Sequence, residues 1–259
     1  MYFIQQHDRK QLPIIWKDTP ISGTAKAIDL PKAYLQLLQE QNGGYLQASR
    51  IPTEEPTSDG IDYASVHYIF GLHDEPETGL YYQQTLPDRA DLPDYFIFFS
   101  ANGNQLFAFD YSKLSPSGEP SIRYIDIETD NWQLVASDFN QFLGLLTAAS
   151  IAVSEETQLT HTEGEHAFLL ADASQLQELF LHFEDDGDKE WYFRWLKYFS
   201  KHADSAYRRA AIEALEMQIL YFRAQLPASA QKLLAVFLAD AEESIVATAK
   251  SLEKELSEG

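Results

Sequence analysis

The pattern of hydrophobic and polar residues changes near residue 150. Before it, short runs of aromatic and β-branched residues alternate with turn-forming residues, which is typical of β-strands. From about residue 165, apolar residues recur every three or four positions, which is typical of amphipathic helices. The sequence therefore predicts an α+β domain over residues 1–150, a polar linker over 151–164 and an all-helical domain over 165–259.

Five runs give the strand signals of the first domain. They lie at residues 63–70, 95–99, 105–110, 121–127 and 132–136. Gly103 lies between the second and third runs and can adopt the positive φ of a tight connection, so these runs are predicted to form a hairpin. The turn-forming residues 128–131 predict a second hairpin between the last two runs.

A short helix is predicted to begin near Asp29, because this side chain can accept hydrogen bonds from free amides at a helix start. Pro31 is tolerated in the first turn, where amide donors lack partners. The triplet Asn42, Gly43 and Gly44 supplies left-handed backbone that ends the helix. Leu30, Tyr34 and Leu37 are expected to pack this helix onto the sheet.

Capping side chains mark the other helices. Ser137 or Asp138 is predicted to cap a helix that contains Phe139. Three helices of the second domain are predicted to start at Asp172 or Ser174, at Asp186 or Asp188, and at Asp204, and to end near residues 183, 201 and 226. A last helix over residues 228–256 follows Pro227, which makes the second domain an antiparallel helical unit.

Two aromatic clusters each allow two interpretations. Residues 81–82 and 95–99 form either a ligand-stacking surface or one face of the sheet core. Residues 191–199 hold too many aromatic side chains for a single buried stripe. That helix is therefore expected to be packed on two sides, as a bridge to the sheet domain or as an interface with another chain.

Charge narrows the classes of partner. The net charge is −21, with 40 acidic residues against 19 Lys and Arg. Such a chain repels nucleic acid and attracts basic partners. No cysteine is present, which excludes disulfides and thiol catalysis. The first residues lack a basic region followed by an apolar run, and no run of apolar residues is long enough to span a membrane. We therefore expect a soluble cytoplasmic protein.

No motif for catalysis or cofactor binding was found, and we expect neither a cofactor nor a bound metal. The histidines lack the spacing of metal ligands. The acidic run at residues 184–188 lacks the glycine and the twelfth-position acid of a calcium loop, so it is interpreted as an interhelical turn. A paired-carboxylate enzyme remains possible from sequence, since spacing along the chain does not give spacing in space.

Three segments together resemble the SUKH superfamily. The first is the opening helix, with Leu30, Pro31 and Tyr34 before Asn42, Gly43 and Gly44. The second runs from Leu92 through the hairpin around Gly103 to Asp110. The third is residues 134–143, a strand followed by a helix that begins near Phe139. The resemblance covers about residues 25–147 and implies an antiparallel sheet with flanking helices.

The resemblance also implies a role. SUKH domains are protein-binding modules without catalytic residues, found in fungal cell-wall-assembly regulators and in bacterial immunity proteins that neutralise toxins, often nucleases. We therefore expect a protein partner, either a basic toxin domain or a signalling or cell-wall enzyme. Exposed acids at turns are the predicted contacts, namely Asp74, Glu75, Glu77, Asp185 and Asp186. The sequence leaves the oligomeric state open.

Overall fold

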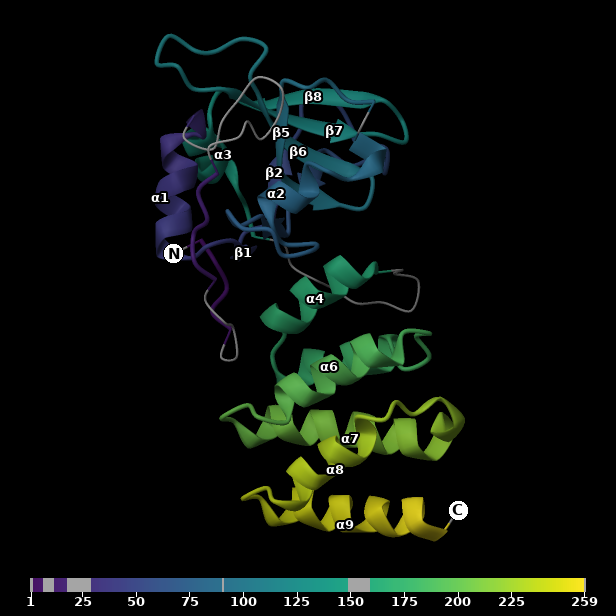
Figure 1. Ribbon diagram of the computed structural model, residues 1–259. Helices are drawn as coiled ribbons and strands as arrows, with labels where there is room; N and C mark the ends of the chain where they lie inside the picture. The colour runs from purple at the N-terminus through teal and green to yellow at the C-terminus, as the bar shows by residue number, and fades with distance from the viewer. Residues whose placement is uncertain (1, 7–11, 18–28, 90, 149–158, 259) are drawn as a thin grey trace. The chain divides into compact units, whose positions relative to one another are not determined.

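The fold is described from a computed structural model (Figure 1), which describes residues 2–6, 12–17, 29–89, 91–148 and 159–258. The chain divides into two compact units, Met1–Ser150 and Ile151–Gly259. The first contains antiparallel sheets and the second is helical, so the predicted fold class is confirmed. None of the helices in the described ranges is long and apolar enough to cross a membrane.

The main sheet of the first unit has four antiparallel strands in the order β5-β6-β7-β8. The strands are β5 (Phe96–Asn102), β6 (Gln105–Asp110), β7 (Ser121–Asp126) and β8 (Asn131–Ala136). Both predicted hairpins are confirmed. Gly103 has φ +56°, as the tight β5–β6 connection requires.

Two small sheets accompany the main one. β1 (Gly44–Tyr45) pairs with β4 (Tyr68–Ile69), and β2 (Arg50–Pro52) pairs with β3 (Tyr63–Ser65). The single strand predicted over residues 63–70 is therefore wrong. Between β3 and β4 the chain changes from pairing with β2 to pairing with β1. This change occurs at Val66, which bonds the Ser49 backbone, and at His67, which bonds the Leu46 backbone.

Helices α1 (Lys32–Glu40) and α3 (Phe139–Leu145) pack on one face of the sheet. Tyr34 of α1 is fully buried, and its ring meets those of Phe109 and Phe139 at centroid distances of 5.2 and 5.4 Å. Its hydroxyl donates a 2.6 Å hydrogen bond to the Phe70 carbonyl. The predicted packing of this helix on the sheet is confirmed. The short helices α2 (Leu80–Gln83) and η2 (Pro87–Arg89) precede β5.

The start of α1 differs from the prediction, whereas that of α3 agrees with it. Pro31 occupies the N-cap position of α1 and no side chain caps the helix, so the assignment of Asp29 as the cap is wrong. Asp29 lies two residues before the N-cap position. Asp138 caps α3 by accepting a hydrogen bond from the Gln141 amide.

The second unit contains six α-helices within the described residues. They are α4 (His161–Leu170), α5 (Ala173–His182), α6 (Lys189–Phe199), α7 (Ser205–Tyr221), α8 (Ala230–Leu238) and α9 (Glu243–Glu258), with the 3₁₀ turn η3 (Arg223–Gln225) after α7. Asp172, Asp188 and Asp204 cap α5, α6 and α7, as predicted. These caps are local, which is why sequence identified them.

Two boundaries in this unit differ from the predictions. The linker was expected to reach residue 164, but α4 begins at His161, where Thr160 and Glu163 form a capping box. The predicted helix over residues 228–256 is two helices, because the chain turns after Leu238. At that turn Asp240 accepts hydrogen bonds from Arg208 and from the Glu242 amide.

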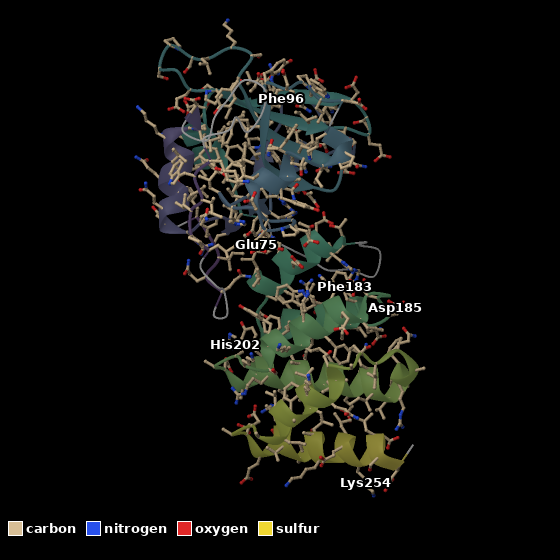
Figure 2. The ribbon with its side chains drawn as sticks, in the orientation of Figure 1. Glu75, Phe96, Phe183, Asp185, His202 and Lys254 are labelled. Carbon is tan, nitrogen blue, oxygen red and sulfur yellow. The ribbon has the colours of Figure 1, made fainter. Side chains whose placement is uncertain are left out.

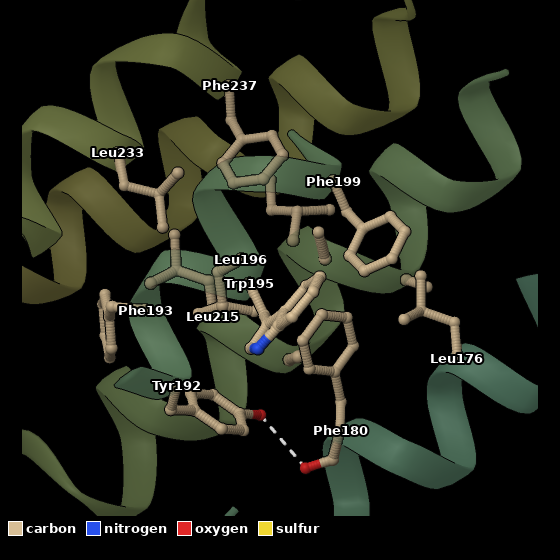
Figure 3. Packing of buried hydrophobic residues seen from close by; sticks show 14 of the residues in the cluster. Leu176, Phe180, Tyr192, Phe193, Trp195, Leu196, Phe199, Leu215, Leu233 and Phe237 are labelled. Carbon is tan, nitrogen blue, oxygen red and sulfur yellow. Dashed lines mark hydrogen bonds between the residues drawn. The ribbon is translucent and has the colours of Figure 1, made fainter. Parts of the chain in front are cut away.

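Aromatic side chains of α6 fill the core of the helical unit (Figure 3). On one side, Phe168 of α4 stacks on Trp195 at 5.0 Å, and Phe180 of α5 meets Tyr192 at 5.7 Å. On the other, Phe193 and Leu196 share the cluster with residues of α7 and α8. The predicted packing of this helix on two sides is confirmed, and these partners belong to its own unit.

Candidate protein-binding surfaces

An acidic loop over residues 72–78 carries three of the predicted contact residues. Asp74, Glu75 and Glu77 are exposed there, and Figure 2 labels Glu75. Asp74 forms an ion pair with Lys17. Glu77 has φ +68°, a left-handed conformation that is uncommon outside glycine. The loop is therefore a tightly folded feature with two carboxylates outside any ion pair that the structure records.

The family-marker residues Asn42 and Gly43 hold the base of this loop. The Asn42 side chain accepts a 2.7 Å hydrogen bond from the Leu72 amide and donates to the carbonyls of Leu12 and Pro13. Gly43 has φ +82°, and a Cβ there would lie 2.6 Å from the Gly71 nitrogen. The marker thus has a physical role, since it lets two backbone segments touch beneath the acids.

The segment over residues 12–17 runs against the same loop and adds apolar surface. The Ile15 amide bonds the Leu72 carbonyl, and Tyr81 donates to the Ile15 carbonyl. Trp16 is 54% exposed and Ile15 is 38% exposed. Exposed tryptophan is enriched at protein interfaces, whose rim is polar, so this segment and the acidic loop are a candidate interface.

A second acidic surface, which sequence did not predict, is called here the acidic edge. It combines the β2–β3 loop, residues 53–62, with the β7–β8 turn, residues 126–131. Neither segment contains Lys or Arg. Its exposed acids are Glu54, Glu55, Asp59, Asp62, Glu128 and Asp130. Within the described ranges, none of them lies within 4.0 Å of a cationic side chain.

Hydrogen bonds join the two segments of the acidic edge. Gln133 accepts from the Glu55 amide at 3.0 Å and donates to the Glu55 carbonyl at 2.9 Å, so its amide group bonds the loop as a neighbouring strand would. Ser58 donates to buried Asp126, whose other oxygen accepts from the Glu128 and Thr129 amides. The exposed acids therefore stand on a fixed backbone.

The field of these carboxylates reaches a buried phenol. Burial first, and then the charges of Asp126 and Asp59, raise the pKa of Tyr124 to about 12, against the opposing effect of a hydrogen bond with Ser58. Negative charge opposes the loss of the phenolic proton. Two carboxylates of the acidic edge thus act on a side chain of strand β7.

Apolar side chains of β8 adjoin the acidic edge. Trp132 and Leu134 are 37% and 49% exposed and lie on the sheet face opposite α1 and α3. Trp132 meets the ring of Phe96, which belongs with Phe98 to a small cluster on that face. These contacts support the core interpretation of residues 95–99, whereas the exposed part of Trp132 is available to a partner.

The last two predicted contact residues lie in the turn between α5 and α6. Asp185 is exposed, and Figure 2 labels it at the margin of the helical unit. Asp186 is partly buried, accepts from the Asp188 amide and pairs with His161 at 2.9 Å. His161 in turn stacks on Trp191 at 4.1 Å. Asp186 thus has a structural role, and the interpretation of residues 184–188 as an interhelical turn is confirmed.

The ionisable side chains of both units bear on metal binding and catalysis. Among the described residues, no group of three or more His, Asp or Glu side chains could hold a metal ion. Burial raises the pKa of Glu165, while a hydrogen bond from Trp191 and the charge of Arg194 act in the opposite direction. These contacts fix Glu165 within the helical packing and explain its shift without a substrate.

Comparisons with known proteins support the resemblance. Residues 25–145 match the SMI1 / KNR4 family (SUKH-1). This region contains both acidic surfaces of the first unit and leaves the helical unit uncovered. No curated protein and no solved structure matched the chain.

Proposed function

We propose, on the premise that residues 25–145 belong to the SMI1 / KNR4 family (SUKH-1), that this protein is a non-enzymatic module that binds a basic protein partner. Members of this family are generally binding domains without catalysis. In the form we favour, the partner is a cationic toxin domain, such as a nuclease, and the protein acts as its immunity protein in the cytoplasm.

The acidic edge is the observation that carries this proposal. It gathers six exposed acids from two segments that are far apart in sequence, and the described residues provide none of them with an ion pair. Nuclease domains need positive charge to bind phosphates, so an acidic surface attracts them and competes with their substrate. Trp132 and Leu134 beside the acids supply the apolar contact that holds a partner after encounter.

Co-expression tests this function. The gene would be expressed together with toxin domains encoded beside it, and growth would be compared with that of cells carrying the toxin alone. We expect protection, together with a stable complex in pull-down. Absence of protection with every adjacent toxin would contradict the immunity role.

A regulatory scaffold is the second candidate, because the matched family is compatible with that role as well. It uses the same acidic surfaces on a housekeeping enzyme of signalling or cell-wall assembly. Recovery of such an enzyme by pull-down, with no toxin gene adjacent, would favour it over immunity.

A further inference from the structure

A cavity of about 390 Å³ lies between α6 and α8 of the helical unit, outside the family match. Four bases line it, namely Arg194, Lys197, Lys201 and Lys232. Glu190 is the one acid among its lining residues. In a chain of net charge −21, such a concentration of positive charge runs against the composition.

Two bases of α6, Arg194 and Lys197, lie on the face of the helix that lines the cavity. Glu190, Arg194 and Lys197 follow each other at spacings of four and three residues, which place them on the same face of α6, and Lys201 lies in the turn two residues after the helix ends. Lys232 faces them from the first turns of α8. Basic side chains from two parts of the helical unit therefore line the same cavity.

The three lysines are not neutralised by the protein. Within the described part of the chain, Lys197, Lys201 and Lys232 have no carboxylate within 4.0 Å, although acids outnumber bases twofold. Only Arg194 is paired, with Glu165 at 3.2 Å. Like charges held around one cavity repel each other, and an anion bound among them relieves that repulsion.

The floor of the cavity is apolar. Phe193 and Leu233 line it with only 2% and 4% of their surface exposed, and Val236 is 38% exposed at its rim. Ser229 adds a buried hydroxyl for which the described residues provide no hydrogen-bond partner. Ligand cavities of this size are mostly apolar with a few convergent polar groups, as here.

We propose that this cavity binds a small anionic amphiphile. The lysines hold its carboxylate, phosphate or sulfonate head group, and its aliphatic or aromatic body lies on Leu233 and Val236. The proposal is independent of the toxin-binding function, because it involves the other unit. A second cavity of about 280 Å³, between α5 and α7, provides the internal contrast, since it is lined by Glu184, Glu213 and Glu216 and by no base.

Calorimetric titration of the full-length protein with matched probes tests the proposal. The probes are octanoate, octylammonium and inorganic phosphate, which separate the head group from the apolar body. We expect saturable binding of one octanoate, binding of phosphate at least tenfold weaker, and none of octylammonium. Equal binding of octanoate and octylammonium would overturn the proposal, because it would show that the charge of the cavity selects nothing.

Variants locate the site. The triple variant Lys197→Gln, Lys201→Gln, Lys232→Gln should bind octanoate at least tenfold more weakly, because three attractive charges are lost. The control Lys113→Gln, Lys250→Gln, Lys254→Gln makes the same change of charge at exposed lysines outside the cavity and should keep the affinity. All six side chains are exposed, and circular dichroism verifies that each variant is folded. Equal affinity of the two triple variants would reject this cavity as the site.

A vesicle assay distinguishes a free amphiphile from a membrane lipid as the source of the anionic head group. Free octanoate is compared with vesicles of phosphatidylglycerol, which present anionic head groups in a membrane. We expect the free amphiphile to bind without vesicles. Binding to vesicles combined with no binding of octanoate would contradict a small-molecule cavity and assign the lysines to a membrane surface instead.

Discussion

The acidic edge of the first unit and the lysine cavity of the second are opposite in charge and also in construction. The edge is built from two loops, tied together by side-chain bonds such as Gln133 to Glu55. The cavity is built mainly from one face of α6 and one side of α8. The edge presents its charges over two loops, whereas the cavity gathers exposed charges around a buried apolar floor.

The difference matters because the background charge is negative. Acidic patches are expected anywhere on a chain with 40 acids, so the acidic edge is informative only through its lack of any base and its neighbouring tryptophan. Unpaired lysines around an apolar cavity are not expected from the composition. Long-range attraction of a large basic partner suits the first surface, and enclosure of a small anion suits the second.

The largest expected loss of stability is that of the first unit when Gly43 is replaced. Gly43→Ala should destabilise the first unit by about 3 kcal/mol, because alanine is strained at φ +82° and its Cβ would meet the Gly71 nitrogen at 2.6 Å. Denaturant unfolding followed by tryptophan fluorescence measures it. Trp16 and Trp132 report on the first unit, and Trp191 and Trp195 on the second.

Gly103→Ala is the matched control for this substitution. Gly103 also has positive φ, but a Cβ there would meet nothing within 4 Å. Its cost should be about 1 kcal/mol, from backbone strain alone. Equal costs at the two glycines would show that the contact between Gly43 and Gly71 contributes nothing to stability.

A smaller effect is expected at the turn that separates α8 from α9. Asp240→Asn should cost the helical unit about 2 kcal/mol, since the Asp240 carboxylate accepts two hydrogen bonds from Arg208, at 2.8 and 3.0 Å. The hydrogen bond from Arg208 lowers the pKa of Asp240. Thermal unfolding as a function of pH measures the loss of stability and shows whether it comes from the charge of Asp240.

The sign of the pH dependence follows from that lowered pKa. The stabilisation is complete above the ordinary pKa of an aspartate, about 4, and is lost as pH falls through the lower folded value. The difference between wild type and Asp240→Asn should therefore shrink below about pH 4. A difference that stays constant down to pH 2 would exclude the ion pair as its source.

Removal of the Asn42 side chain should cost less. Asn42→Ala deletes three hydrogen bonds at the base of the acidic loop and should destabilise the first unit by about 1.5 kcal/mol. The Leu72 amide, which loses its acceptor, should exchange with solvent roughly tenfold faster in hydrogen-exchange measurements. Unchanged protection of this amide would show that the loop is held by other contacts.

Sequence identified features that depend on neighbouring residues. Asp204 was predicted as a cap, and Asp138, Asp172 and Asp188 were each one of two predicted candidates, because a cap bonds amides two or three positions away. The capping box of Thr160 and Glu163 was equally local, and its Thr-x-x-Glu pattern could have placed the start of α4 correctly.

Features that depend on distant partners were missed. The break after α8 involves Arg208, 32 residues before Asp240. Glu55 and Gln133, which join the acidic edge, are 78 residues apart. The alternation within residues 63–70 could not reveal that its two halves pair with different strands. The bases Arg194, Lys197 and Lys201, by contrast, lie three and four residues apart, a local signal in the sequence that was missed.

The acidic edge as a partner surface is tested most directly by association kinetics. The triple variant Glu54→Lys, Glu55→Lys, Glu128→Lys would be compared with Glu243→Lys, Glu253→Lys, Glu255→Lys, an equal change of charge on exposed residues of α9. The measurement is the association rate with the basic partner recovered by co-expression, at low and high salt. We predict that the first variant associates at least tenfold more slowly at low salt, that the second changes less than threefold, and that the difference narrows at high salt. Equal rates for the two variants would contradict the account.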